Sequence, residues 1–192
     1  MLKELVLKNR SYRGYDQSAR IAHKDLISLI DHARLMPAMR NTQPLKYFLA
    51  SDDEMVAKIL PHTNWAGLLP ELQLPFPETN PTAFIVVLQD KCIASAIAKH
   101  QLDVGIACAT ITLAAAEAGF GCCMIHNYSA KGVNEAIQVP ENLSPVMVIA
   151  VGIAAEEIAI TEAIDNETDY YRDDKNVHYV PKRRLEEIIV NG

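Results

Sequence analysis

The sequence predicts a single domain in which helices pack over a mixed β-sheet. A length of 192 residues suits one hydrophobic core and is short for two. Helical and strand-like patterns alternate along the chain as far as Ile153, an order that implies a sheet covered by helices. The content of 49% hydrophobic and 22% charged residues is ordinary for a globular protein. We therefore expect the chain to fold without disulfides or metal.

The first half of the chain alternates helices, strands and two loops. Apolar residues recur at helical spacing ahead of the polar segment 9–15, and again over residues 26–33. Pro37 should end this second helix, because the residue before a proline avoids the helical region. We expect a polar loop at 37–44, strands at 45–50 and 82–89, a helix at 52–60, and a loop or lid over the proline-rich residues 61–81.

The second half contains the strongest helix pattern, residues 93–118, which Gly119 is placed to terminate. We expect strands at 120–126 and 146–153 and a helix at 130–138. An arm follows from about residue 155 to 192, with an acidic stretch, a basic segment at 180–184 and an apolar tail. The apolar tail at 185–190 has no partner strand of its own, so docking on its own core and docking on a second subunit both stay open.

Composition excludes several classes of function. The net charge of −6 argues against nucleic-acid binding, because phosphate contacts need a dense cationic surface. The weakly polar stretch 104–116 is shorter than the roughly 20 residues of a membrane span. The first eight residues are too charged for a secretory signal, so we expect a cytoplasmic protein. The cysteines and histidines lack metal-ligand spacing, so we expect no metal site.

Three polar segments suit a ligand that carries phosphate: residues 10–13, 41–44 and 182–184. Guanidinium groups bind phosphate bidentately through charge-assisted hydrogen bonds, and two separate basic clusters stand out in an acidic chain. Charge runs usually face water, so solvated surface is the alternative interpretation.

Four motifs in order resemble the nitroreductase family, and together they span nearly the whole chain. They are Arg10-Ser-Tyr-Arg-Gly-Tyr15, the loop from Pro37 to Leu45, Leu102-Asp-Val-Gly105 with Ala118-Gly-Phe-Gly-Cys-Cys-Met-Ile125, and Val180-Pro-Lys-Arg-Arg-Leu185. The resemblance implies an α+β fold with a mixed, mainly antiparallel sheet. It also implies an intertwined homodimer with swapped terminal arms and two FMN molecules at the subunit interface.

The resemblance assigns roles to particular residues. Arg10, Ser11 and Arg13 would contact the phosphate and the polar edge of the flavin, and Lys182 and Arg184 would complete the phosphate site. Asn41 and Gln43 would come from the partner subunit, and Cys123, Met124, Ile125 and His126 would pass the N5 side of the ring through their backbone amides. A histidine beside N5 suits a proton donor. A surface histidine at a strand end is the alternative for His126.

The chain departs from the family pattern at three positions. Asn9 stands where many members carry a basic residue, Ala38 replaces a serine, and Leu45 replaces a tryptophan. The hydroxyl missing at Ala38 removes a hydrogen bond worth about 0.5 to 1.5 kcal/mol, so we expect weaker FMN binding than in typical members.

Other residues have simpler interpretations. Cys122 and Cys123 point to opposite faces of a strand, which favours core packing over a redox pair. Gly119-Phe-Gly121 is interpreted as a helix-to-strand turn, because it lacks the third glycine and the following helix of a dinucleotide fingerprint. Trp65 and Phe76 either form a wall over the flavin or pack the loop onto the core.

The sequence therefore predicts an oxidoreductase that passes electrons from NAD(P)H through FMN to an electron-poor acceptor such as a nitroaromatic or quinone. A flavin-binding protein that stores or senses the cofactor is the second hypothesis, and a structural domain is the third. Family resemblance fixes neither the acceptor nor the choice between NADH and NADPH, nor whether one or two electrons move.

Overall fold

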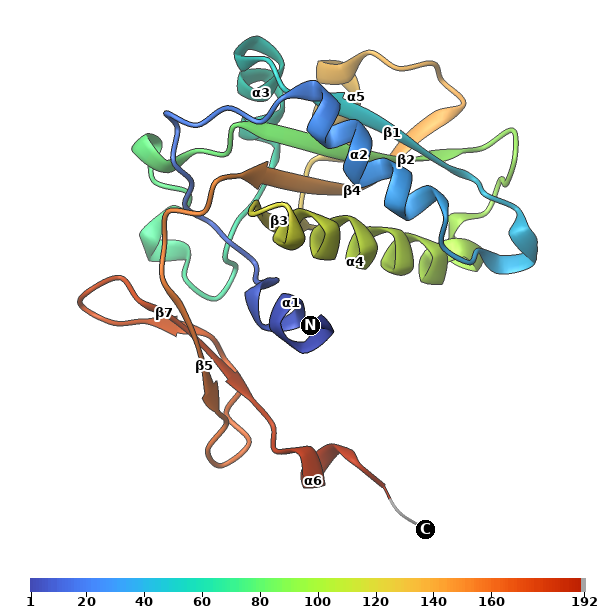
Figure 1. Cartoon of the computed structure of the whole chain (residues 1–192). Helices are drawn as coiled ribbons and strands as arrows, with labels where there is room; N and C mark the ends of the chain where they lie inside the picture. Colours follow the sequence, from blue (N-terminus) through green and yellow to red (C-terminus); the bar gives the residue numbers. More distant parts are fainter. Residues whose placement is uncertain (191–192) are drawn as a thin grey trace.

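A four-stranded antiparallel sheet forms the centre of the computed structural model, which describes residues 1–190 (Figure 1). Residues 191–192 of the predicted arm lie outside the described residues. The strand order is β1-β2-β4-β3, and each neighbouring pair is antiparallel. The strands are β1 (Leu45–Ala50), β2 (Ala83–Asp90), β3 (Gly121–Ile125) and β4 (Leu143–Gly152). The predicted α+β architecture is confirmed, and β3 lies at one edge of the sheet.

Helices cover both faces of this sheet. The helices α2 (His23–Arg34) and α4 (Gln101–Glu117) pack on one face, and α3 (Asp53–Ile59) and α5 (Ala130–Ile137) pack on the other. The central strand β2 shows why two layers are needed, because its alternate residues belong to different cores. Ile85 and Val87 face α2 and α4, and their neighbours Phe84 and Val86 face α3 and α5. A strand that is apolar on both sides must be covered on both sides.

The long predicted helix begins later than the sequence indicated. We expected it to start at residue 93, whereas α4 starts at Gln101 after a short 3-10 helix at Ile97–His100. The reason is the turn after β2: the Asp90 carboxylate accepts the Cys92 backbone N–H at 3.0 Å, and the Gln89 side chain donates to the Ala94 carbonyl at 2.6 Å. These bonds hold the chain in a turn that the apolar pattern did not reveal. At its other end α4 stops as predicted, and Gly119 has φ of 85°.

The loop before β2 contains little regular structure, as its prolines predicted. Short 3-10 helices occur at Leu60–His62, Pro70–Leu72 and Pro77–Thr79. Trp65 packs against the core between the sheet and α3, and its indole N–H donates to the Thr63 hydroxyl at 2.8 Å. The packing alternative for Trp65 is therefore the one that the structure shows.

The arm contains a second sheet, which the sequence pattern did not predict. Its strands are β5 (Ile158–Glu162), β6 (Tyr171–Arg172) and β7 (His178–Lys182), in the order β5-β7-β6, and a short helix α6 (Leu185–Ile188) follows. The pair β5 and β7 is parallel, and no tight turn connects its strands. This sheet projects from the main body beside α1 (Leu2–Lys8) (Figure 1). In the part of the chain that the structure describes, no helix is long and apolar enough to cross a membrane.

Candidate functional site

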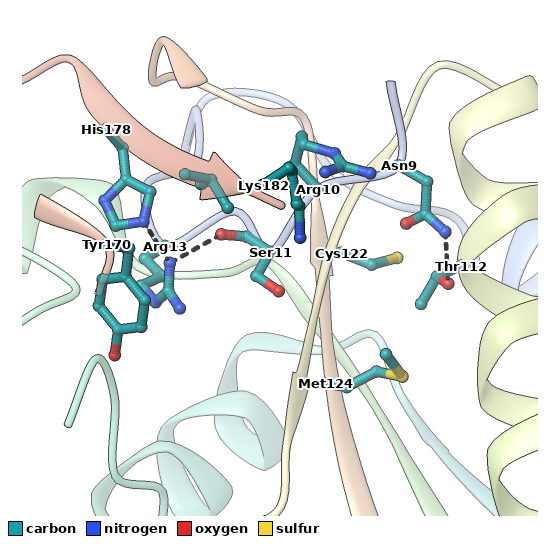
Figure 2. Close-up of a pocket in the computed structure, with 11 residues that line it drawn as sticks. Asn9, Arg10, Ser11, Arg13, Thr112, Cys122, Met124, Tyr170, His178 and Lys182 are labelled. Carbon is teal, nitrogen blue, oxygen red and sulfur yellow. Dashed lines mark hydrogen bonds between the residues drawn. The ribbon is translucent and has the colours of Figure 1, made fainter. Parts of the chain in front are cut away.

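A cavity of about 350 Å³ lies where four parts of the chain meet, beside the edge of the main sheet (Figure 2). The segment after α1, strand β3, helix α4 and the arm each supply part of its wall. The lining residues are Asn9, Arg10, Ser11, Arg13, Thr112, Cys122, Met124, Tyr170, His178, Val180 and Lys182. Its size falls in the range of pockets that bind small molecules.

The segment 9–15 runs alongside β3 and reaches the cavity from there. Ser11 forms a parallel bridge with Cys122, and the Tyr12 N–H donates to the Cys122 carbonyl at 2.9 Å. Gly121 permits this approach, because a Cβ at that position would stand 2.9 Å from the Tyr12 ring. Tyr15 is fully buried and donates its hydroxyl to the Tyr12 carbonyl at 2.7 Å. The polar motif is thus fixed by a tyrosine anchor on either side of Arg13.

Three cationic residues line the cavity: Arg10, Arg13 and Lys182. Arg10 donates from Nη2 to the Val6 carbonyl at 2.7 Å, and Arg13 donates from Nη1 to the Ser11 carbonyl at 3.1 Å. The Nε–H groups of both arginines are buried and have no hydrogen-bond partner within residues 1–190. Buried donors are normally paired, so these guanidinium groups suit an anionic ligand that accepts from them.

The arm surrounds Arg13 from two directions. Glu156 accepts from the Arg13 backbone N–H and also pairs with Arg172 in a buried ion pair. His178 Nε2 lies 3.0 Å from Arg13 Nη1, and the Arg13 guanidinium carbon lies 4.8 Å above the centre of the Tyr170 ring. Burial, and then the charges of Arg13 and Arg172, lower the pKa of His178 to about 4. Its imidazole is therefore neutral at physiological pH.

Strand β3 divides the predicted flavin segment between two faces. Met124 lies on the cavity with Cys122, whereas Cys123 and Ile125 are buried in the core on the opposite face. The Cys122 carbonyl points to the free edge of the sheet, where Tyr12 donates to it. Because backbone groups of alternate strand residues point the same way, Met124 also directs its N–H and carbonyl to this edge. His126 lies beyond the strand and lines a separate cavity of about 550 Å³.

Asn41 and Gln43 lie away from this cavity within the same chain. Gln43 lines a different cavity of about 190 Å³, beside the first turns of α4. Its side chain donates to the Asn41 side-chain oxygen at 2.9 Å. Both residues have left-handed backbone conformations, with φ of 54° and 51°. Such conformations are uncommon outside glycine and are often found in functional loops.

Arg184 lies outside the cavity, where its side chain pairs with Glu162.

Phe76 lines another cavity of about 250 Å³, which Arg13 and Glu156 also line. Among residues 1–190, no group of three or more histidine, cysteine or acidic side chains is arranged to hold a metal ion.

Sequence reasoning missed several residues that line the cavity. Thr112 was hidden in an apolar helix, and Tyr170 and His178 belong to an arm whose sheet was not predicted. One signal was present in the sequence. His178, Val180 and Lys182 alternate along β7, so the side chains of His178 and Val180 lie on the same face of the strand as Lys182, which is predicted to bind phosphate.

The fold and the site define a class: an α+β protein with a helix-covered antiparallel sheet and, at the sheet edge, a cavity lined by cationic side chains. A model of the nitroreductase family matches residues 6–153. The chain belongs to the nitroreductase family.

Relatives support this placement. A protein of Archaeoglobus fulgidus, named as a candidate NADH dehydrogenase/NAD(P)H nitroreductase, is 26% identical over 171 residues, which cover 84% of this chain and 90% of the relative. A nitroreductase family protein from Streptococcus pneumoniae has the same fold, with a TM-score of 0.73, 18% identity and full coverage of both chains. A candidate nitroreductase of Exiguobacterium sibiricum, solved in complex with FMN, has a TM-score of 0.68 and 20% identity over 81% of this chain and 89% of its own.

Proposed function

We propose that this protein is an FMN-dependent oxidoreductase that passes electrons from NAD(P)H to an electron-poor acceptor such as a nitroaromatic or a quinone. The observation that carries the proposal is the cavity at the sheet edge. It gathers Arg10, Arg13 and Lys182 in a chain of net charge −6, and it holds two guanidinium Nε–H groups without protein partners. This donor set fits a phosphate group.

The cavity is lined both by cationic side chains and by residues of β3. Arg10, Arg13 and Lys182 would hold the phosphate and the polar edge of the flavin, together with the Ser11 hydroxyl. Arg184 would join them on release from Glu162. The exposed Met124 side chain and the backbone groups of β3 would lie along the ring. Ile125 and Cys123 would contribute through the backbone of the same strand.

Bound FMN supplies the redox chemistry, accepting electrons from the nicotinamide and giving them to the acceptor. The task of the chain is to place the reactants and to supply positive charge. Arg13 is fixed by bonds to its backbone and its side chain, so its charge is held in place before ligand binds. A cation near the polar edge of a flavin favours the reduced anion. His126 would hold a proton on the acceptor side, in the separate cavity that it lines.

Two subunits would complete the site. Neither Asn41 nor Gln43 lines the cavity that holds Arg13, and Gln43 lines a different cavity beside α4. Apolar side chains are exposed nearby: Leu102 is 81% exposed, and Met36, Met39 and Ile106 are also exposed. Burying such a surface against a second copy would stabilise a homodimer and bring Asn41 and Gln43 to the partner's cavity. Light scattering tests this arrangement, and a stable monomer that retains FMN would contradict it.

The proposal is tested by titrating FMN into flavin-free protein and following the quenching of flavin fluorescence. We expect saturable binding with one FMN per chain. Titration with riboflavin, which lacks the phosphate, is the matched control, and it should bind more weakly if the three cations hold phosphate. Equal affinity for the two ligands would remove the role of the cations, and absence of FMN binding would overturn the proposal. Tight FMN binding without electron transfer from NADH or NADPH would favour cofactor storage or sensing.

A further inference from the structure

His178 is an unusual neighbour for an arginine that faces a ligand cavity. It is 1% exposed, and it lies between two guanidinium groups, with Nε2 3.0 Å from Arg13 Nη1 and Nδ1 3.3 Å from Arg172 Nε. It belongs to β7 in the arm, outside residues 6–153 that match the family model. The contact between His178 and Arg13 therefore connects the arm to the motif at residues 10–15 (Figure 2).

The single acceptor nitrogen of a neutral imidazole limits which of the two arginines can donate a hydrogen bond to His178. A neutral imidazole has one acceptor nitrogen, whereas both of its ring nitrogens face donors. Arg172 forms a buried ion pair with Glu156 through its Nη2 group, and its Nε–H faces His178 Nδ1 at 3.3 Å. Arg13 has only the Ser11 carbonyl besides His178 on its Nη1 group. The Arg13 contact is the shorter of the two, at 3.0 Å against 3.3 Å, and we therefore assign the acceptor to Nε2, which leaves the Nδ1–H facing Arg172 Nε.

We propose that His178 is a positioning residue that holds the Arg13 guanidinium in the orientation that receives an anionic ligand in the cavity. With Nη1 tied to Ser11 and His178, the guanidinium is fixed and its buried Nε–H is left without a protein partner. The Tyr170 ring supports the guanidinium at 4.8 Å. A side chain that is already ordered loses less entropy when it binds. A neutral acceptor is also required, because a charged imidazole between two guanidinium groups would repel both; burial and these two cations hold the pKa of His178 at about 4.

This inference rests on the proposed function for the identity of the ligand, but the contact can be tested separately. Two amide substitutions form a matched pair: His178→Gln keeps an acceptor at the distance of Nε2, and His178→Asn places its amide nearer Nδ1, out of reach of Arg13. FMN affinity is measured on apo protein whose folding is checked by circular dichroism and by its unfolding temperature. Loss of a charge-assisted hydrogen bond predicts about tenfold or more weaker binding in His178→Asn, with His178→Gln close to wild type.

A second comparison separates positioning from general stability. In an Arg13→Gln background, His178→Asn and His178→Gln should bind FMN equally, because the group that His178 positions is gone. Equal affinity of the two His178 variants in the wild-type background would overturn the inference. The inference would also be overturned if the two His178 variants differed in FMN affinity by the same factor in the Arg13→Gln background as in the wild-type background.

Inorganic pyrophosphate provides a probe that does not depend on flavin. Pyrophosphate should raise the unfolding temperature of wild type and His178→Gln by mass action, and should raise that of His178→Asn less. If wild type binds no FMN but shows this pattern, the proposed function fails and the positioning role stands. If pyrophosphate stabilises the two variants equally or has no effect on wild type, the positioning role fails.

Discussion

Asn9 donates a hydrogen bond from its side-chain amide to the Thr112 hydroxyl at 2.9 Å, which joins the segment after α1 to the middle of α4. Both residues line the cavity, and Thr112 is almost fully buried. The motif resemblance leads us to expect a basic residue at the position of Asn9. In this chain the position serves as a neutral connection between two walls of the cavity.

Removing either partner of this pair should destabilise the protein. Asn9→Ala and Thr112→Val should each lower the free energy of unfolding by about 1 kcal/mol, since Thr112→Val leaves a part-buried N–H without an acceptor. The double variant should lose less than the sum of the two, as measured by urea denaturation. Thr112→Ser keeps the hydroxyl and serves as the control. Strict additivity would show that the bond contributes nothing.

Reversing the charge of Arg13 should abolish flavin retention. Arg13→Glu places a carboxylate beside Glu156 and among the groups that line the cavity, where it would repel an anion. Arg20→Glu is the matched control, because Arg20 is exposed and pairs with Asp53 at the surface. The measurement is the ratio of flavin to protein absorbance after purification. An Arg13→Glu protein that retains full FMN would contradict the site assignment.

The four cysteines should react with a thiol reagent at very different rates. Cys92 is exposed, and the other three are buried. Burial raises the pKa of Cys108 to about 12 and that of Cys123 to about 11, and it raises the pKa of Cys122 further. The thiolate is the reactive form, so native protein should show one fast thiol and denatured protein four. A second fast thiol in the native state would revive Cys122 or Cys123 as a redox group.

His178 should make stability depend on pH in acid. Its pKa is lowered from 6.5 to about 4 in the folded protein by burial and by the Arg13 and Arg172 charges, with Glu156 and Tyr170 also facing this cluster. The unfolded chain therefore takes up the proton first as pH falls, and stability is lost between about pH 6.5 and pH 4. This one group contributes a slope of up to about 1.4 kcal/mol per pH unit there, and none above that interval.

The control for this prediction is His178→Gln, which cannot titrate. Subtracting its stability from that of wild type at each pH removes the contributions of the carboxylates, which also titrate in acid. A difference that stays constant from pH 7 to pH 4 would show that His178 titrates normally.

Local sequence patterns predicted those helices and strands whose structure depends mainly on their own residues. The apolar run of β2 and the apolar turns of α4 must be buried wherever they occur, and Gly119 ends α4 because only that residue accepts its left-handed backbone cheaply. The parallel pair β5 and β7 was missed, because its strands are distant in sequence and no turn residue connects them.

Local patterns likewise predicted some residues of the candidate site and missed others. Arg10, Ser11, Arg13 and Lys182 stand in short motifs, and the structure brings them to one cavity. Tyr170 has no local signal, and the alternation of His178 with Lys182 is informative only once β7 is known, because the place of both residues depends on the arm folding back onto the first motif. The proposed approach of Asn41 and Gln43 to a partner's cavity would depend on a second chain, which no pattern within one chain determines.

The central claim is tested most directly by the visible absorption spectrum of the FMN-loaded protein, recorded without oxygen before and after adding NADH or NADPH. We expect the spectrum of oxidised flavin, which should bleach with at least one donor and return when a quinone or nitroaromatic is added. A protein that takes up no flavin even from excess FMN would contradict the account. A bound flavin that neither donor bleaches would contradict its catalytic part and leave a flavin-binding protein.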